Sequence, residues 1–150
     1  AAAARELGKR AVLLVGDDPR NRVAGPPSPD LLMCAYAPYS TLFPRAAAIV
    51  HQGGVGTTAQ ALRAGKPTLI VPYAHDQPDN AFRVESLGVS RTLYPRQYRA
   101  PRVASTLRAL LDDPAIARTA GAVAERVRAE DGVALACGEI ERVLTARGVT

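Results

Sequence analysis

The residue types best suited to chemistry are gathered in one glycine-rich segment, which reads His51, Gln52, Gly53, Gly54, Val55, Gly56, Thr57 and Thr58. Three glycines within four residues let the backbone adopt positive φ and approach a ligand closely. The segment leads into a predicted helix, whose first N–H groups lack partners and lie at the positive end of the helix dipole. Thr57 and Thr58 add hydroxyl donors, and His51 adds an N–H, or a positive charge if protonated. Together these groups suit a diphosphate.

The alternative interpretation of this segment is a plain glycine turn between a strand and a helix, with Thr57 as the helix cap. The segment matches neither the dinucleotide fingerprint G-x-G-x-x-G nor the Walker pattern G-x-x-x-x-G-K-[ST]. The position of His51 immediately before three glycines favours the ligand-binding interpretation.

A second polar pair, Asp76-Gln77, follows the next apolar run along the chain. A carboxylate beside an amide can accept from and donate to neighbouring hydroxyl groups, as the recognition of a sugar requires. The alternative is that Asp76 simply caps the next helix. His75 stands beside this pair and is interpreted as a residue at the rim of a pocket rather than as a catalytic one.

The elements that must position these residues alternate between strands and helices. Short apolar runs predict buried strands at 10–15, 31–35, 47–50, 68–71 and 90–93. Helices are predicted at 40–46, at 57–64 with Gly65 as its stop, and from the Asp76 cap to a stop at Gly88. The stretch 16–30, with its four prolines, is predicted to be a mobile loop.

After Pro95 the apolar spacing is typical of helices only. Three stripes carry this pattern: 103, 107, 110 and 111; then 116, 120, 123 and 127; then 136, 140, 143 and 144. The whole pattern predicts an α/β fold, a Rossmann-like parallel sheet with helices on both faces, followed by C-terminal helices. Because ligands of such sheets bind at the carboxyl ends of the strands, the loops at His51 and His75 should open onto one edge.

The composition is that of an ordinary globular chain. Its 150 residues are enough for a single domain over 1–150, and 22% of them are charged. The net charge of +5 favours anionic partners without choosing among them. Cys34 and Cys137 are predicted to be buried free thiols of a cytoplasmic protein, with neither a disulfide framework nor a metal-binding spacing. No signal peptide and no membrane-spanning segment are expected.

Segment 36–93 resembles the donor-binding signature of the UDP-glycosyltransferase superfamily, and most of all its bacterial and sterol-type branch. Members of that branch carry a His-x-Gly-Gly-x-Gly-Thr loop and a later Asp-Gln pair. The resemblance implies the C-terminal half of a GT-B fold and three groups of binding residues. These are His51, Gly53, Gly54, Gly56, Thr57 and Thr58 for the diphosphate, Asp76 and Gln77 for the sugar, and Tyr36 and Ala37 for the base.

Three positions depart from the family pattern. Tyr39 stands where many members have Gln, and Ala59 stands where the plant branch has a Glu that holds the ribose. Gly54 and Val55 replace the Trp-Asn of that branch. For Tyr36, the alternative to stacking on the base is a tyrosine buried in the core.

The resemblance also implies the reaction: an inverting transfer of a hexose from a UDP-sugar, or alternatively a dTDP-sugar, to a hydroxyl of a small hydrophobic acceptor. It requires no cofactor and no metal. The acceptor-binding N-terminal domain, which supplies the general base, is expected to be absent from this chain. The chain itself is therefore predicted to bind the donor without transferring the sugar.

Other function classes stay open on the residues alone. One is a non-catalytic nucleotide-sugar-binding or regulatory module that acts with a partner chain. A nucleic-acid binder is less favoured, and its support is a basic and aromatic stretch, namely Arg91, Tyr94, Arg96, Tyr98, Arg99 and Arg102. A dinucleotide-dependent oxidoreductase is disfavoured because the first strand is not followed by G-x-G-x-x-G.

Overall fold

The strands of the protein belong to two parallel sheets. The computed structural model describes residues 1–22 and 28–148. One sheet pairs β1 (Ala11–Leu14) with β2 (Leu31–Cys34). The other has the order β3 (Ile49–His51), β4 (Thr68–Ile70) and β5 (Ser90–Thr92). Each of the five predicted strands is present. Strand β1 is two residues shorter than predicted, β2, β4 and β5 are one residue shorter, and β3 starts two residues later and ends one residue later.

From residue 39 onward the helices follow the predicted order. The helices are α1 (Ala2–Glu6), α2 (Tyr39–Leu42), α3 (Val55–Ala64), α4 (Gln77–Ser86), α5 (Ala100–Asp112), α6 (Pro114–Ala129) and α7 (Gly132–Ala146), with 3-10 turns η1 (Pro19–Asn21), η2 (Phe43–Arg45) and η3 (Pro95–Gln97). The predicted helix 40–46 is thus divided between α2 and η2. Residues 23–27 of the predicted mobile loop lie outside the described residues.

Helices cover both faces of the three-stranded sheet, because successive side chains of a strand point to opposite faces. Leu69 of β4 packs in one cluster with residues of α1 and α5, including Ala3 and Val103. Its neighbour Ile70 packs in another cluster with residues of α4 and α6, including Val84 and Ala120. The predicted fold class is therefore confirmed.

The two sheets stay apart in the described part of the chain, where neither β1 nor β3 has a strand on its second edge. A cleft of about 280 Å³ is lined by Lys9, which precedes β1, by Ala47, which precedes β3, and by residues of α5. At the centres of the two strands, Val12 and Val50 are each 42% exposed.

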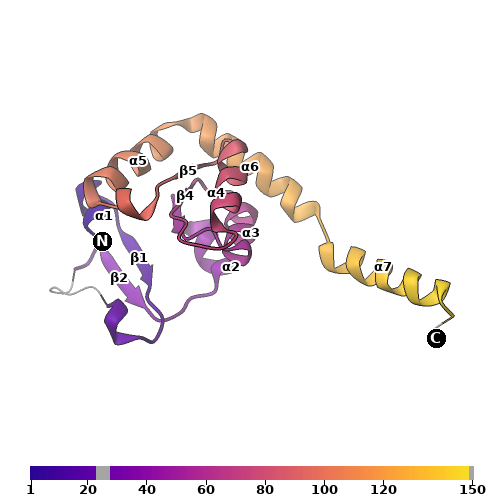
Figure 1. Ribbon diagram of the computed structural model, residues 1–150. Helices are drawn as coiled ribbons and strands as arrows, with labels where there is room; N and C mark the ends of the chain where they lie inside the picture. Colours follow the sequence, from indigo (N-terminus) through magenta and orange to yellow (C-terminus); the bar gives the residue numbers. More distant parts are fainter. Residues whose placement is uncertain (23–27, 149–150) are drawn as a thin grey trace.

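Helix α7 extends away from the rest of the molecule (Figure 1). Asp131 caps it by accepting from the Ala134 N–H at 3.0 Å. None of its described residues is buried, so its predicted apolar stripe, which includes Ile140 at 60% exposure, faces solvent. Cys137 lies on this helix and is exposed, so the prediction that it is buried was wrong. Across the described ranges, no helix is both long and apolar enough to span a bilayer.

Candidate functional site

The glycine-rich loop joins β3 to α3 and begins at His51, the last residue of the strand. Helix α3 starts at Val55, two residues earlier than the pattern predicted. Gly54 is the N-cap, with an extended backbone at ψ 143°, and no side chain caps the helix. The alternative in which Thr57 serves as the cap is therefore wrong, since Thr57 already lies inside the first turn.

Gly53 occupies a position that only glycine fits. Its φ is 91°, in the region that side chains disfavour. A Cβ there would stand 2.9 Å from Cγ2 of Ile70 and 3.2 Å from the carbonyl oxygen of Gln77. The loop backbone therefore lies directly against β4 and the start of α4, and the close approach fixes its path.

The imidazole of His51 is neutral and has a defined tautomer. The Gly53 N–H donates to its Nδ1 at 3.0 Å, so the ring proton resides on Nε2. Burial lowers the pKa of His51 from its ordinary value of 6.5 to about 4. Of the two roles predicted for the ring at neutral pH, the lowered pKa and the hydrogen bond to Nδ1 therefore favour the N–H donor over the positive charge.

Several donors around this loop have no acceptor in the described residues. The N–H groups of Gly54, Val55, Gly56 and Thr57 precede the first bond of α3, in which the Thr58 N–H donates to the Gly54 carbonyl. Nε2 of His51 and Oγ1 of Thr58 are buried and also lack partners in that part of the chain. An unpaired buried polar group costs about 1–3 kcal/mol. Such a gathering is typical of a site that binds an acceptor-rich ligand.

The second loop, between β4 and α4, contains a left-handed turn at His75, whose φ is 58°. This conformation costs an ordinary side chain about 1–2 kcal/mol. Oε1 of Gln77 stabilises the turn by accepting from the N–H groups of Tyr73 at 2.8 Å and Ala74 at 3.2 Å. Gln77 therefore helps to shape the loop, and its amide nitrogen remains able to donate to a ligand.

Asn80, which no sequence motif indicated as a site residue, connects Asp76 to the glycine-rich loop. Nδ2 of Asn80 donates to Oδ2 of Asp76 at 2.8 Å and to the carbonyl oxygen of Gly53 at 2.9 Å. Asp76 occupies the N-cap position of α4, but its side chain makes no capping hydrogen bond. Its carboxylate is exposed and has further lone pairs to offer. The prediction that both loops open onto one edge is confirmed by this contact.

Tyr36 and Ala37 follow β2, on the segment that leads into α2. The Tyr36 side chain is 78% exposed, so the alternative of a buried core tyrosine was wrong. Helix α2 packs against α3, the helix that begins at the glycine-rich loop. Tyr39 stacks on the buried ring of Phe43 with centroids 4.4 Å apart.

The basic and aromatic stretch after β5 lies largely at the surface, and Tyr94 and Tyr98 are 54% and 46% exposed. The pKa of Tyr98 is raised, first by partial burial and second by the nearby Tyr73. Tyr73 begins the left-handed turn, so this stretch borders the second loop rather than forming a separate face.

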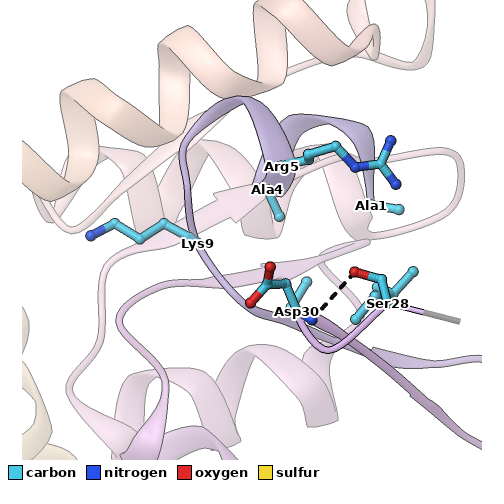
Figure 2. Close-up of a pocket in the computed structure, with 8 residues that line it drawn as sticks. Ala1, Ala4, Arg5, Lys9, Ser28 and Asp30 are labelled. Carbon is cyan, nitrogen blue, oxygen red and sulfur yellow. Dashed lines mark hydrogen bonds between the residues drawn. The ribbon is translucent and has the colours of Figure 1, made fainter.

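Two clefts of the described surface lie away from these loops. Figure 2 shows a cleft of about 40 Å³ at the amino ends of β1 and β2, the opposite ends of the strands from the candidate site. The Arg5 and Lys9 side chains at its rim extend in opposite directions, and the Asp30 N–H donates to Ser28 Oγ at 3.3 Å. In residues 1–22 and 28–148, no three His, Cys, Asp or Glu side chains are close enough to hold a metal ion.

Comparison with known proteins finds one family over nearly the whole chain. The family described as "Erythromycin biosynthesis protein CIII-like, C-terminal domain" matches residues 3–142. The O-mycaminosyltylonolide 6-deoxyallosyltransferase of Streptomyces fradiae is 41% identical over 142 residues, which make up 94% of this chain and 32% of that protein. The sterol 3-beta-glucosyltransferase of Saccharomyces cerevisiae (strain YJM789) is 37% identical over 122 residues, 81% of this chain and 10% of that protein.

Solved structures agree with this result. A glycosyltransferase of kitacinnamycin superposes with a TM-score of 0.84 at 28% identity, covering 93% of this chain and 36% of that one. The spinosyn rhamnosyltransferase SpnG complexed with thymidine diphosphate gives a TM-score of 0.80 at 27% identity, covering 93% of this chain and 38% of that one. The chain therefore spans about a third of the length of the deoxyallosyltransferase and of these two structures, and a tenth of the sterol glucosyltransferase.

Proposed function

The chain belongs to the family of the erythromycin biosynthesis protein CIII-like C-terminal domain, and on that premise we propose that its two loops form the donor site of a glycosyltransferase. The resemblance to the UDP-glycosyltransferase superfamily is confirmed by the family match and by the relatives. The proposed ligand is a nucleoside-diphosphate sugar, and the proposed acceptor is a hydroxyl group of a small hydrophobic molecule.

The observation that carries this proposal is the row of unpaired donors at the start of α3. The N–H groups from Gly54 to Thr57 lie where the helix dipole is positive, and His51, three residues before Gly54, has a neutral Nε2–H that also lacks a partner in the described residues. Val55 and Gly56 are exposed, so a diphosphate can reach this turn without displacing core residues. We assign the diphosphate to His51, Gly53, Gly54, Gly56, Thr57 and Thr58.

The sugar is assigned to Asp76 and Gln77, and the base to Tyr36 and Ala37. The exposed carboxylate of Asp76 can accept from sugar hydroxyl groups, and the amide nitrogen of Gln77 can donate to them. Tyr36 offers an exposed ring on which a base can stack, an interaction that contributes about 1–3 kcal/mol.

In the proposed reaction, an acceptor hydroxyl attacks the anomeric carbon on the face opposite the leaving group. A general base removes the hydroxyl proton, and the bond from the anomeric carbon to the diphosphate oxygen breaks. The sugar thus passes to the acceptor with inversion, and the nucleoside diphosphate leaves with an added negative charge. The unpaired N–H groups of α3 and the Nε2–H of His51 stabilise this developing charge.

The base of the donor is proposed to be a pyrimidine. Uracil and thymine differ by one methyl group, whose burial contributes about 0.8 kcal/mol, or roughly four-fold in affinity. The SpnG structure with thymidine diphosphate supports thymine, and the resemblance to UDP-glycosyltransferases supports uracil. Both nucleotides therefore belong in the test.

The general base and the acceptor pocket are proposed to lie on a further domain of a longer protein. Neither histidine of this chain suits the role, because His51 is buried against its own loop and His75 belongs to the donor-side turn. Two features of the surface support a further domain: the exposed apolar stripe of α7 and the unpaired edges of β1 and β3. A non-catalytic module that acts with a partner chain is the second candidate, which the same features support.

The test is isothermal titration calorimetry of the protein with UDP, dTDP, GDP and their glucose conjugates. Binding of UDP or dTDP, with GDP weaker, is expected. Preference for GDP, or no binding of any nucleotide, would overturn the donor-site proposal. Incubation with an acceptor then separates the two candidates: glucose transfer that requires an added N-terminal domain supports the enzyme, and binding without transfer in its presence supports the module.

A further inference from the structure

The side chain of Asn80 joins the two loops of the site. It lies on α4, one helical turn after Asp76 and 27 residues after Gly53. Both hydrogen atoms of its amide are used, one by the Gly53 carbonyl at 2.9 Å and the other by Asp76 Oδ2 at 2.8 Å. We propose that Asn80 is a positioning residue that holds the sugar-binding carboxylate and the diphosphate-binding loop in one fixed arrangement. This inference rests on the donor site proposed above.

The contact of Asn80 with the Gly53 carbonyl sets the direction of a backbone N–H that can donate to the ligand. In a trans peptide the carbonyl and the following N–H point in opposite directions within one plane. Fixing the Gly53 carbonyl on Asn80 therefore aims the Gly54 N–H away from α4, and that N–H has no acceptor in the described residues. A hydrogen bond to a peptide carbonyl also polarises the peptide, which makes its N–H a better donor to an anion.

The contact with Asp76 sets the orientation of the carboxylate. Because the side chain of Asp76 makes no capping hydrogen bond, Asn80 is its partner within the described residues. With Oδ2 occupied, Oδ1 remains the freer oxygen for a sugar hydroxyl. The opposite side of Gly53 is held as well, since its N–H donates to His51 Nδ1 at 3.0 Å. One chain of contacts thus runs from Asp76 through Asn80 and Gly53 to His51.

A residue that acts in this way should affect the sugar and the diphosphate differently. The measured quantity is the ratio of the Kd of the nucleotide-sugar to the Kd of the free nucleoside diphosphate, by calorimetry. Asn80→Ala is expected to raise this ratio about 10-fold, the size of one lost hydrogen bond to a charged group. In the double variant with Asp76→Ala the same change should have no further effect, because Asn80 acts on the sugar through Asp76.

Asn80→Asp supplies a readout that a merely structural role would not move. The variant nearly preserves the shape but places a second carboxylate beside Asp76, so one of the two groups acquires a raised pKa. A protonated Asp at position 80 can donate one hydrogen bond, whereas the ionised form repels both partners. As the pH is lowered from about 8 to about 5.5, the Kd ratio of Asn80→Asp should therefore fall toward the wild-type value. The Kd ratio of Asn80→Ala should stay raised and show the same pH dependence as that of wild type.

The matched control is Asp79→Asn, which changes one charge on the same turn of α4. Asp79 is exposed and forms an ion pair with Arg83 at 2.7 Å. The Kd ratio of the Asp79→Asn variant should stay within roughly two-fold of the wild-type ratio. If wild type binds nucleotide-sugars but Asn80→Ala leaves the ratio within roughly two-fold, and Asn80→Asp shows no recovery in acid, the positioning role is wrong. If wild type binds no nucleotide, the proposed function fails instead.

Discussion

The neutral, buried state of His51 has a measurable consequence for stability in acid. In the folded protein its pKa is lowered from 6.5 to about 4 by burial. In the unfolded chain the ring is solvated and titrates near its ordinary value. The unfolded state therefore binds a proton before the folded state does, and the folded state loses stability as the pH falls from about 6.5 to about 4.

The size of the effect follows from the two pKa values. Each ten-fold difference in protonation corresponds to about 1.4 kcal/mol. At pH 4.5 the expected loss, relative to pH 7.5, is therefore about 2–3 kcal/mol of the free energy of unfolding. Above about pH 7 both states are neutral at this position and His51 adds no pH dependence.

The variant that isolates this effect is His51→Asn. The amide oxygen of Asn can take the place of Nδ1 as the acceptor of the Gly53 N–H, but Asn does not titrate. Urea unfolding of wild type and of this variant at the two pH values gives the comparison. The variant should lose about 2–3 kcal/mol less between pH 7.5 and pH 4.5 than wild type does.

Equal pH dependence in wild type and variant would refute the reasoning, because it would mean that His51 titrates alike in the folded and unfolded states. The same variant also tests the site. Its diphosphate affinity should fall by about 1.5–3 kcal/mol, since the Nε2–H donor to a charged ligand is lost. Unchanged affinity would remove His51 from the diphosphate contact.

Three further predictions concern stability and nucleotide binding. Gly53→Ala should lower the free energy of unfolding in urea by about 1–3 kcal/mol, because φ is 91° and the new Cβ would lie 2.9 Å from Ile70 Cγ2. Gly56→Ala adds a Cβ with no heavy atom within 4 Å, so it should raise the free energy of unfolding by up to about 1 kcal/mol while weakening diphosphate binding. A loss of stability in Gly56→Ala would contradict this prediction. Tyr36→Ala should change the free energy of unfolding by less than about 0.5 kcal/mol but weaken nucleotide binding by about 1–3 kcal/mol. The similarly exposed Phe82→Ala should change neither quantity by more than about 0.5 kcal/mol, and an equal loss of affinity in both variants would count against stacking. Ile140→Ala should leave the free energy of unfolding within about 0.5 kcal/mol, since α7 has no buried residue, and a large loss would show that its stripe is covered in solution.

The sequence was sufficient for the order of the elements and for the placement of the two loops. Apolar runs located each strand, and Gly65 ended α3 in the left-handed conformation that the pattern predicted, at φ 69°. These features depend on neighbours in the sequence. The α/β class followed from the alternation of the elements, and the shared edge of the loops followed from the rule for parallel sheets.

Features that depend on contacts between residues far apart in the sequence could not be predicted from it. The link made by Asn80 joins residues that only folding brings together, although its spacing of four from Asp76 on a predicted helix was a usable signal. The neutral state of His51 depends on how deeply the ring is buried. The apolar spacing correctly predicted that α7 is a helix with an apolar face. The spacing does not specify what packs against that face, which is exposed to solvent in the described residues.

The unpaired edges of β1 and β3 bear on how this chain behaves in concentrated solution. An open strand edge presents unsatisfied N–H and C=O groups and is a template for the backbone of another molecule. Here two such edges belong to parallel strands, each has an exposed valine at its centre, and the residues leading into both line one cleft. Because β1 and β3 have four and three residues, each edge can pair with few residues of another molecule, so the expected result is weak, reversible self-association that grows with concentration.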